Sequence, residues 1–170
     1  SGDLQIIQLE ACTVAASHFQ YSTEPEGPAI QNLVEWASKN GILDAGNPPR
    51  FFGFNNPDPF RSEKKPQYGY EFWVTVAPNA TGGDGIAIKT SQAGEYLALS
   101  GLGLAGWEWV KTKMGQWSKE TGYEYDHSRQ YLEEHIANSA NFGRFPSLKG
   151  KERWKAITIC LPIKKSAAAG

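Results

Sequence analysis

The sequence predicts an α+β fold built from two copies of a strand–helix–strand–strand (βαββ) unit. Segment 36–41 begins with Trp and ends with Gly, and segment 117–122 repeats this pattern 81 residues later. Runs of β-branched and aromatic residues that are typical of strands follow at 70–76 and at 156–163. Because helices and strands do not alternate strictly along the chain, this order indicates an α+β domain and not a doubly wound one.

Each predicted helix ends at a glycine. Apolar residues recur at helical spacing before Trp36 and before Trp117. Gly41 and Gly122 follow, where a left-handed C-terminal cap is expected. The remaining strands are predicted in pairs that share the repeat: opening strands over 4–19 and 86–100, and short strands over 50–54 and 131–135.

The two copies are predicted to form a single domain over residues 1–165, with repeat one at about 4–78 and repeat two at about 86–165. Two such units join most simply edge to edge, which places both helices on one face of an antiparallel sheet. A ligand groove is then expected between the helices, near the pseudo-two-fold axis. The residues outside these strands and helices are assigned as exposed loops at 55–67 and 138–153 and as a disordered tail at 166–170.

The composition is that of an ordinary globular domain. Of the 170 residues, 40% are hydrophobic and 21% are charged, and 17 Lys and Arg face 18 Asp and Glu. No run is long enough to span a bilayer, and the start lacks the pattern of a signal peptide, so we expect a cytoplasmic protein without membrane contact. A net charge of −1 argues against direct binding of nucleic acid, which depends on clustered Lys and Arg.

Neither a metal site nor a cofactor site is predicted. Cys12 and Cys160 both lie among apolar neighbours, which is typical of buried small side chains. The three histidines do not add ligands at zinc-site spacing. The glycines 101, 103 and 106 match a dinucleotide-binding string, but the parallel strand–helix units that such a site needs are missing, so they predict a tight turn into the second helix.

The segment 131–136 contains the most informative acid. Strand alternation places Tyr131, Glu133 and His135 on one face, so either Glu133 or Glu134 must point inward. With the repeat offset carried forward without a gap, Phe52 occupies the position of Glu133 in the first copy. A buried carboxylate needs a partner or a purpose: it could form a salt bridge with Lys or Arg, or it could open toward the groove.

A second acid, Glu71, shares one strand face with Trp73. If Glu71 and Glu133 both open toward the groove, the site is acidic and aromatic and suits a lipophilic cation. The same acid could instead act as a general base on water. Tyr96, Trp107 and Trp109 are candidate pocket walls, with plain core packing as the alternative for each.

Several ordered motifs resemble the GyrI-like small-molecule-binding family, which also supplies the effector-binding domain of bacterial multidrug-responsive transcription activators. The resemblance spans Leu4 to Lys165 and is carried by the segments 69–76, 93–96, 117–123, 132–135 and 161–163. It implies a duplicated βαββ unit with a central cleft in which a buried acid meets cationic aromatic ligands. The acid corresponds to Glu133, and the Tyr-Glu-x-Trp strand corresponds to Glu71 and Trp73. Many relatives carry Glu-x-Tyr where this chain has His135, which could tune the acid or simply form a hydrogen bond.

The resemblance leaves three functions open. Because the chain has no room for a DNA-binding module, it resembles a stand-alone member that binds lipophilic, cationic or aromatic drugs or toxins through Glu133, Glu71, Trp73, Tyr96, Trp107, Trp109, Tyr131 and His135. An alternative is a cofactor-independent hydrolase that opens cyclopropane-bearing toxins and so confers resistance, with Glu133 and Glu71 as catalytic residues. A third is a protein partner such as gyrase, which some relatives inhibit.

Overall fold

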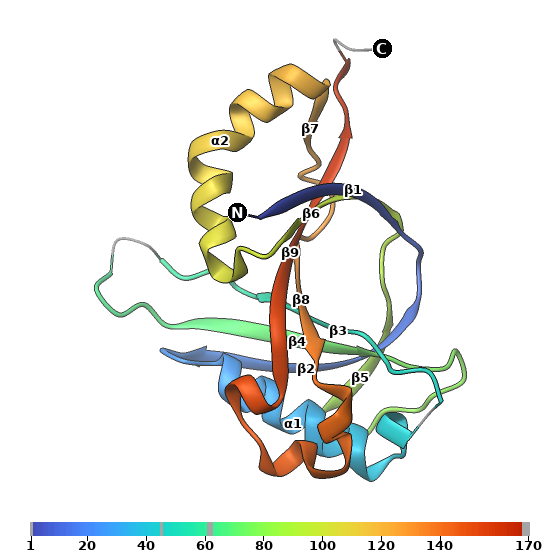
Figure 1. Ribbon diagram of the computed structural model, residues 1–170. Coiled ribbons are helices and arrows are strands. Elements are labelled where there is room, and N and C mark those ends of the chain that lie inside the picture. The colour runs from blue at the N-terminus through green and yellow to red at the C-terminus, as the bar shows by residue number, and fades with distance from the viewer. Residues whose placement is uncertain (1, 45, 61–62, 168–170) are drawn as a thin grey trace.

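The computed structural model describes residues 2–44, 46–60 and 63–167. Within these residues the chain forms two α-helices and nine β-strands (Figure 1). The helices are α1 (Glu26–Lys39) and α2 (Gly106–Thr121). The strands are β1 (Asp3–Leu9), β2 (Thr13–Ser22), β3 (Phe51–Asn55), β4 (Tyr68–Thr75), β5 (Ile86–Thr90), β6 (Gly94–Ser100), β7 (Tyr123–Tyr125), β8 (Leu132–Ala137) and β9 (Trp154–Lys165).

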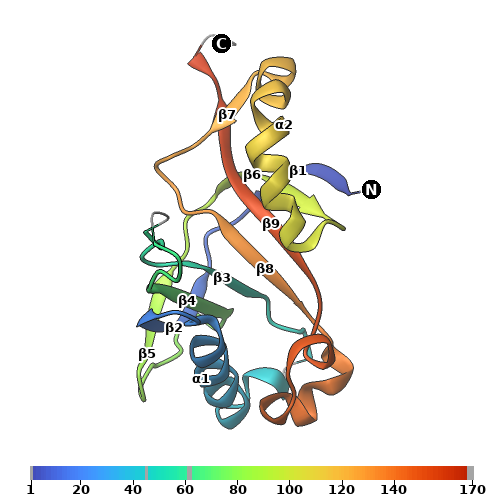
Figure 2. The same cartoon turned by 90° about the vertical axis from the view of Figure 1, so that its left-hand side faces the viewer.

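The strands form an open antiparallel sheet in the order β1-β6-β9-β8-β3-β4-β2-β5, and β7 pairs with β9. This order confirms the α+β fold with internal symmetry, since β8 and β3 meet at the centre and each half continues outward in the same way. Both central strands lie between α1 and α2 in the two views (Figures 1 and 2).

The first strand of each repeat pairs with a strand of the other repeat. The predicted opening strand 4–19 is two strands, β1 and β2, and 86–100 is likewise divided into β5 and β6. β1 pairs with β6 of the second repeat, whereas β5 pairs with β2 of the first. The break in each opening strand therefore marks the point where the chain crosses from one half of the sheet to the other.

Both helices cover the same face of the sheet, as predicted. A row of directly paired residues runs from Ile159 through Glu133 and Gly53 to Phe72, and paired residues project from the same face. Ile159 belongs to the core beneath α2, and Phe72 belongs to the core beneath α1. The opposite face carries a separate apolar cluster that includes Phe52, Phe54, Tyr96, Leu132 and Cys160.

The glycines predicted to end the helices have the expected geometry. Gly41 and Gly122 adopt φ angles of +72° and +78°, a left-handed conformation that costs glycine little. Gly101 and Gly103, at φ +78° and +56°, turn the chain from β6 into the region of α2. The glycine string is therefore a tight turn, as predicted.

The predicted match between Phe52 and Glu133 is wrong, because the two side chains lie on opposite faces of the sheet. Phe52 pairs with Glu134 and lies in the cluster away from the helices, whereas Glu133 lies on the helix face. Because alternate residues of a strand face opposite sides, an odd offset of 81 would exchange the two faces. The residues of β3 on the same face as Glu133 are Phe51, which packs beneath α1, and Gly53, which pairs with Glu133.

The segment 138–153, predicted as an exposed loop, instead folds into two 3₁₀ helices, Ser139–Ser147 and Gly150–Glu152. Phe145 of this segment is fully buried in the core beneath α1. Arg153 is only 4% exposed, and its guanidinium donates to the carbonyl oxygens of Phe145 and Leu148 and to Oε1 of Gln31 on α1. The buried arginine thus ties the segment to the helix.

The chain ends beyond β9. The backbone N–H of Ser166 donates to the carbonyl oxygen of Gly122 at 2.8 Å. Residues 168–170 of the predicted disordered tail lie outside the described residues. No helix in the described part of the chain is long and apolar enough to cross a membrane.

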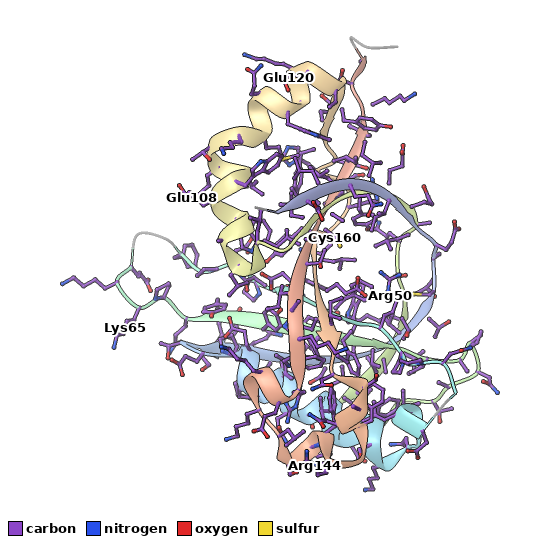
Figure 3. The ribbon with its side chains drawn as sticks, viewed as in Figure 1. Arg50, Lys65, Glu108, Glu120, Arg144 and Cys160 are labelled. Atoms are coloured by element: carbon purple, nitrogen blue, oxygen red, sulfur yellow. The ribbon has the colours of Figure 1, made fainter. Side chains whose placement is uncertain are left out.

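We expect Arg153→Met to lower the free energy of unfolding by about 2–4 kcal/mol, because it leaves several buried carbonyl groups without a donor. Arg144→Met is the matched control, since Arg144 belongs to the same segment and is exposed (Figure 3). Urea denaturation of the two variants tests this. Equal stabilities would show that Arg153 does not hold the segment.

Candidate ligand-binding site

A buried carboxylate lies between the two helices, on the central strand β8. Glu133 is 9% exposed. Its Oε1 accepts a hydrogen bond from the Tyr70 hydroxyl at 2.8 Å, and its Oε2 accepts one from the Trp107 indole Nε1 at 2.9 Å. Within the described residues no Lys or Arg forms an ion pair with it. Two neutral aromatic donors therefore hold a negative charge that no protein cation balances.

Three elements bring these groups together. Gly53 of β3 pairs directly with Glu133, and a Cβ atom at Gly53 would lie only 2.2 Å from the Tyr70 hydroxyl oxygen. The missing side chain lets the Tyr70 ring cross β3 and reach the carboxylate. Trp107 comes from the first turn of α2 and packs edge-on against Tyr131, with ring centroids 4.8 Å apart.

Burial raises the pKa of Glu133, and the hydrogen bonds from Trp107 and Tyr70 offset this only in part. The nearby charge of Glu26 raises that pKa further. Burial and the charge of Glu133 in turn raise the pKa of Tyr70 well above its usual range, which keeps its hydroxyl protonated as a donor. Burial therefore disfavours the ionised form of Glu133, and the neutral donors beside it compensate for only part of this cost.

The sequence analysis did not assign Tyr68, Tyr70 or Glu26 to the site around Glu133. Tyr70 and Tyr68 project from the same face of β4, and the Tyr68 hydroxyl hydrogen-bonds to Oε1 of Glu26 in the first turn of α1. The signal was available in the alternation of Tyr68, Tyr70 and Phe72, which marks one buried face of the strand.

Glu71 and Trp73 lie on the face of the sheet opposite to Glu133, so the three do not form one site as predicted. They pair with Phe54 and Phe52, whose side chains lie on the face away from the helices. Glu71 accepts from Lys89 Nζ at 2.8 Å, from the Trp73 indole at 2.6 Å and from Asn56. Burial opposes its ionisation, but these partners outweigh burial and lower its pKa. The charge of Glu71 is thus balanced by Lys89, and its role is structural.

The alternative left open between Glu133 and Glu134 is decided by the register. Glu134 lies on the face away from the helices and forms a bidentate ion pair with Arg50, at 2.8 Å for each hydrogen bond. Only Glu133 faces the space between the helices.

His135 belongs to the core and does not touch the carboxylate of Glu133. Its ring packs edge-on against Phe72 at 4.9 Å and Trp154 at 5.3 Å. Its Nδ1–H donates to the backbone carbonyl of Glu133 at 3.1 Å. Burial lowers its pKa to about 4, so the imidazole is neutral at physiological pH. Of the two roles considered for His135, the hydrogen bond is the one observed.

The predicted pocket-wall residues Tyr96, Trp107 and Trp109 do not lie together. Tyr96 is 2% exposed and lies in the cluster on the far face, beneath the guanidinium of Arg129. Trp109 packs edge-on against Trp117, away from the contact between Trp107 and Tyr131. An open pocket along α2 is lined by Trp107 together with Leu104, Glu108, Val110, Lys111, Tyr125 and His127. The indole that donates to Glu133 therefore also forms part of this pocket wall.

Residues 3–163 match the family described as the GyrI-like small molecule binding domain. The chain belongs to this family. The match covers both repeats and both faces of the sheet. It confirms the family resemblance of the sequence motifs and makes binding of a small molecule the function of the domain.

Solved structures of the same fold have low sequence identity to this chain. A hydrolase from Listeria innocua is 12% identical, with a TM-score of 0.62 over 95% of this chain and 91% of that one. The EcmrR C-terminal domain is 14% identical, with a TM-score of 0.57 over 96% and 98%. EcmrR in a complex with DNA is 14% identical, with a TM-score of 0.62 over 96% of this chain, which spans 58% of that longer one. No curated protein matches the chain in sequence.

No group of three or more His, Cys, Asp or Glu side chains that could hold a metal ion occurs within the described residues.

We expect Gly53→Ala to destabilise the fold by about 1–3 kcal/mol and to displace Tyr70 from Glu133, because the new methyl group would overlap the tyrosine ring. Gly115→Ala is the control, since Gly115 is exposed in α2 with open space around it, and should stabilise the helix by up to about 1 kcal/mol. Thermal unfolding measures both. A stable Gly53→Ala protein would contradict the close approach of Tyr70.

We also expect Glu133→Gln to unfold at a higher temperature than the natural protein near neutral pH. A carboxyl whose pKa is raised on folding binds a proton more tightly in the folded state, so it costs stability as pH rises above its ordinary value of 4.5. The advantage of the glutamine variant should shrink as pH falls below that value. Melting temperatures measured across this pH range would contradict the assignment if the two proteins differed equally at every pH.

Proposed function

We propose that the domain binds a lipophilic cation that carries aromatic groups, and that Glu133 is the residue that recognises its charge. The observation that supports this is the buried carboxylate held only by the neutral donors Tyr70 and Trp107. Neutral donors satisfy its lone pairs but leave its charge uncompensated, so a ligand cation supplies what the protein lacks.

The surroundings favour an aromatic, weakly hydrated cation over a metal ion or a free ammonium ion. Trp107 and Tyr131 offer ring faces and edges beside the carboxylate, and such rings attract cations most strongly where water is excluded. Trp107 links Glu133 to the pocket along α2, because its indole donates to the carboxylate and its side chain lines that pocket. We propose that the ligand displaces this indole from Oε2 and packs against it while its positive charge approaches Glu133.

Isothermal titration with tetraphenylphosphonium and tetraphenylborate tests this proposal, because the two ions have nearly the same size and opposite charge. The phosphonium ion should bind, and Glu133→Gln should weaken its binding by about 10- to 100-fold through loss of one buried charge pair. Glu134→Gln is the matched control, since its carboxylate neighbours Glu133 in sequence but lies on the opposite face in an ion pair with Arg50.

Two results would contradict the proposal: equal affinity for the two ions, or equal losses in the Glu133 and Glu134 variants. The first would show that charge is not recognised, and the second would place the cation elsewhere.

A second candidate function uses the same acid as a general base that activates water against a strained electrophile such as a cyclopropane-bearing toxin. The raised pKa of Glu133 supports it, because a base works best when its pKa approaches the pH of the reaction. Glu71 does not fit this role, since Lys89 neutralises it on the far face. Mass spectrometry separates the two functions: a binder returns the compound unchanged, whereas a hydrolase returns a water adduct that Glu133→Gln does not form.

Contact with a protein such as gyrase stays a prediction of the family resemblance.

A further inference from the structure

A small, partly open pocket of about 50 Å³ lies on the face of the sheet away from the helices, and the function proposed for Glu133 does not use it. Its walls come from β1, β2, β3, β4, β6 and β8, so both repeats build it. It is closed on its outer side by the two segments where the chain crosses between the repeats, represented by Cys12 and Ser91. In Figure 3, Arg50 lies within the curve that these crossing segments trace.

The two crossing segments are tied to each other across the pocket. The backbone N–H of Cys12 donates to the Ser91 hydroxyl at 2.9 Å, and the backbone N–H of Ser91 donates to the Cys12 carbonyl oxygen at 2.8 Å. The Cys12 thiol also contacts the Ser91 hydroxyl at 3.2 Å. This clasp holds the outer wall at a fixed position over the sheet and leaves the Cys12 sulfur at the pocket lining.

The pocket floor is aromatic. Phe52, Trp73 and Tyr96 line it, and Leu132 completes the wall. These side chains belong to the apolar cluster of the far face and come from four different strands. Aromatic rings that line one small pocket favour a flat apolar ligand, because such a ligand buries apolar surface and contacts the rings.

Two charged residues line the pocket, Arg50 and Glu10. Arg50 forms the bidentate ion pair with Glu134, whereas Glu10 forms no salt bridge within the described residues. Glu10 is exposed, so the pocket differs from the site of the buried Glu133. Polar groups that can bond a hydroxyl or an amide remain at the lining, from Gln92, Gln130 and Thr75.

We propose that this pocket is a second ligand site, separate from Glu133, that binds a small uncharged aromatic molecule bearing one hydrogen-bonding group. The aromatic floor recognises the ring, and the polar side chains at the lining recognise the hydroxyl or amide. The proposal is independent of the function proposed for Glu133, because the two sites lie on opposite faces of the sheet.

The test uses 4-fluorophenol as the probe, with its binding followed by fluorine NMR. Methyl methanethiosulfonate converts the half-buried Cys12 thiol to a methyl disulfide, with methanesulfinate as the leaving group, and so places an extra group in the pocket of the folded protein. Cys160 is the internal control, because it is fully buried and burial raises its pKa to about 12, which suppresses the reactive thiolate.

We expect saturable binding of 4-fluorophenol, protection of Cys12 from the reagent by bound probe, and at least about tenfold weaker binding after Cys12 is modified. Glu133→Gln should bind the probe as the natural protein does, and Cys12→Ser should bind it before and after treatment with the reagent. An unchanged melting temperature of the modified protein shows that the fold survives.

The proposal is overturned if no saturable binding is found at millimolar probe, if modification of Cys12 leaves binding unchanged, or if Glu133→Gln abolishes it. The last result would place the probe at the Glu133 site. Because tetraphenylphosphonium titration of the same samples reports on Glu133, failure of one site is distinguished from failure of the other.

Discussion

The arrangement of the centre of this protein depends on one buried negative charge. Glu133 lies on a central strand, where removal from water disfavours its ionised form. The fold accommodates it with a glycine on the paired strand, a tyrosine from the next strand and an indole from the first turn of α2. Each of these groups is placed by a different element, so the site exists only when the two repeats are joined.

The comparison with Glu71 shows how strongly the surroundings decide the role of an acid. Both glutamates are buried in inner strands of the sheet, Glu71 in β4 and Glu133 in β8, and both accept a hydrogen bond from an indole. The pKa of Glu71 is lowered because Lys89 lies 2.8 Å away, whereas the pKa of Glu133 is raised by burial, which the hydrogen bonds from its uncharged donors offset only in part. The first arrangement is a structural ion pair, and the second is a carboxyl without a cationic partner among the described residues.

The exchange of first strands explains why one small domain offers two different faces. β1 and β5 each join the sheet half of the other repeat, and the chain that leads from them closes over the face away from the helices. The helix face is left to α1, α2 and the carboxylate between them. The two faces share the central strands, since Leu132 and Phe52 on one side are sequence neighbours of Glu133 and Gly53 on the other.

The sequence by itself determined the duplicated α+β fold, the ends of both helices at Gly41 and Gly122, and that one of the neighbouring acids Glu133 and Glu134 points inward. These features depend on local patterns: periodicity, left-handed glycines and an acid in an apolar strand. Tertiary structure alone decided which face each acid occupies, that Phe52 and Glu133 lie on opposite faces of the sheet, and that Lys89 balances the charge of Glu71. The physical reason is that strand pairing determines which face and which partners each side chain has. A shift of the pairing register by one residue moves every side chain of a strand to the other face, and the sequence repeat does not reveal such a shift.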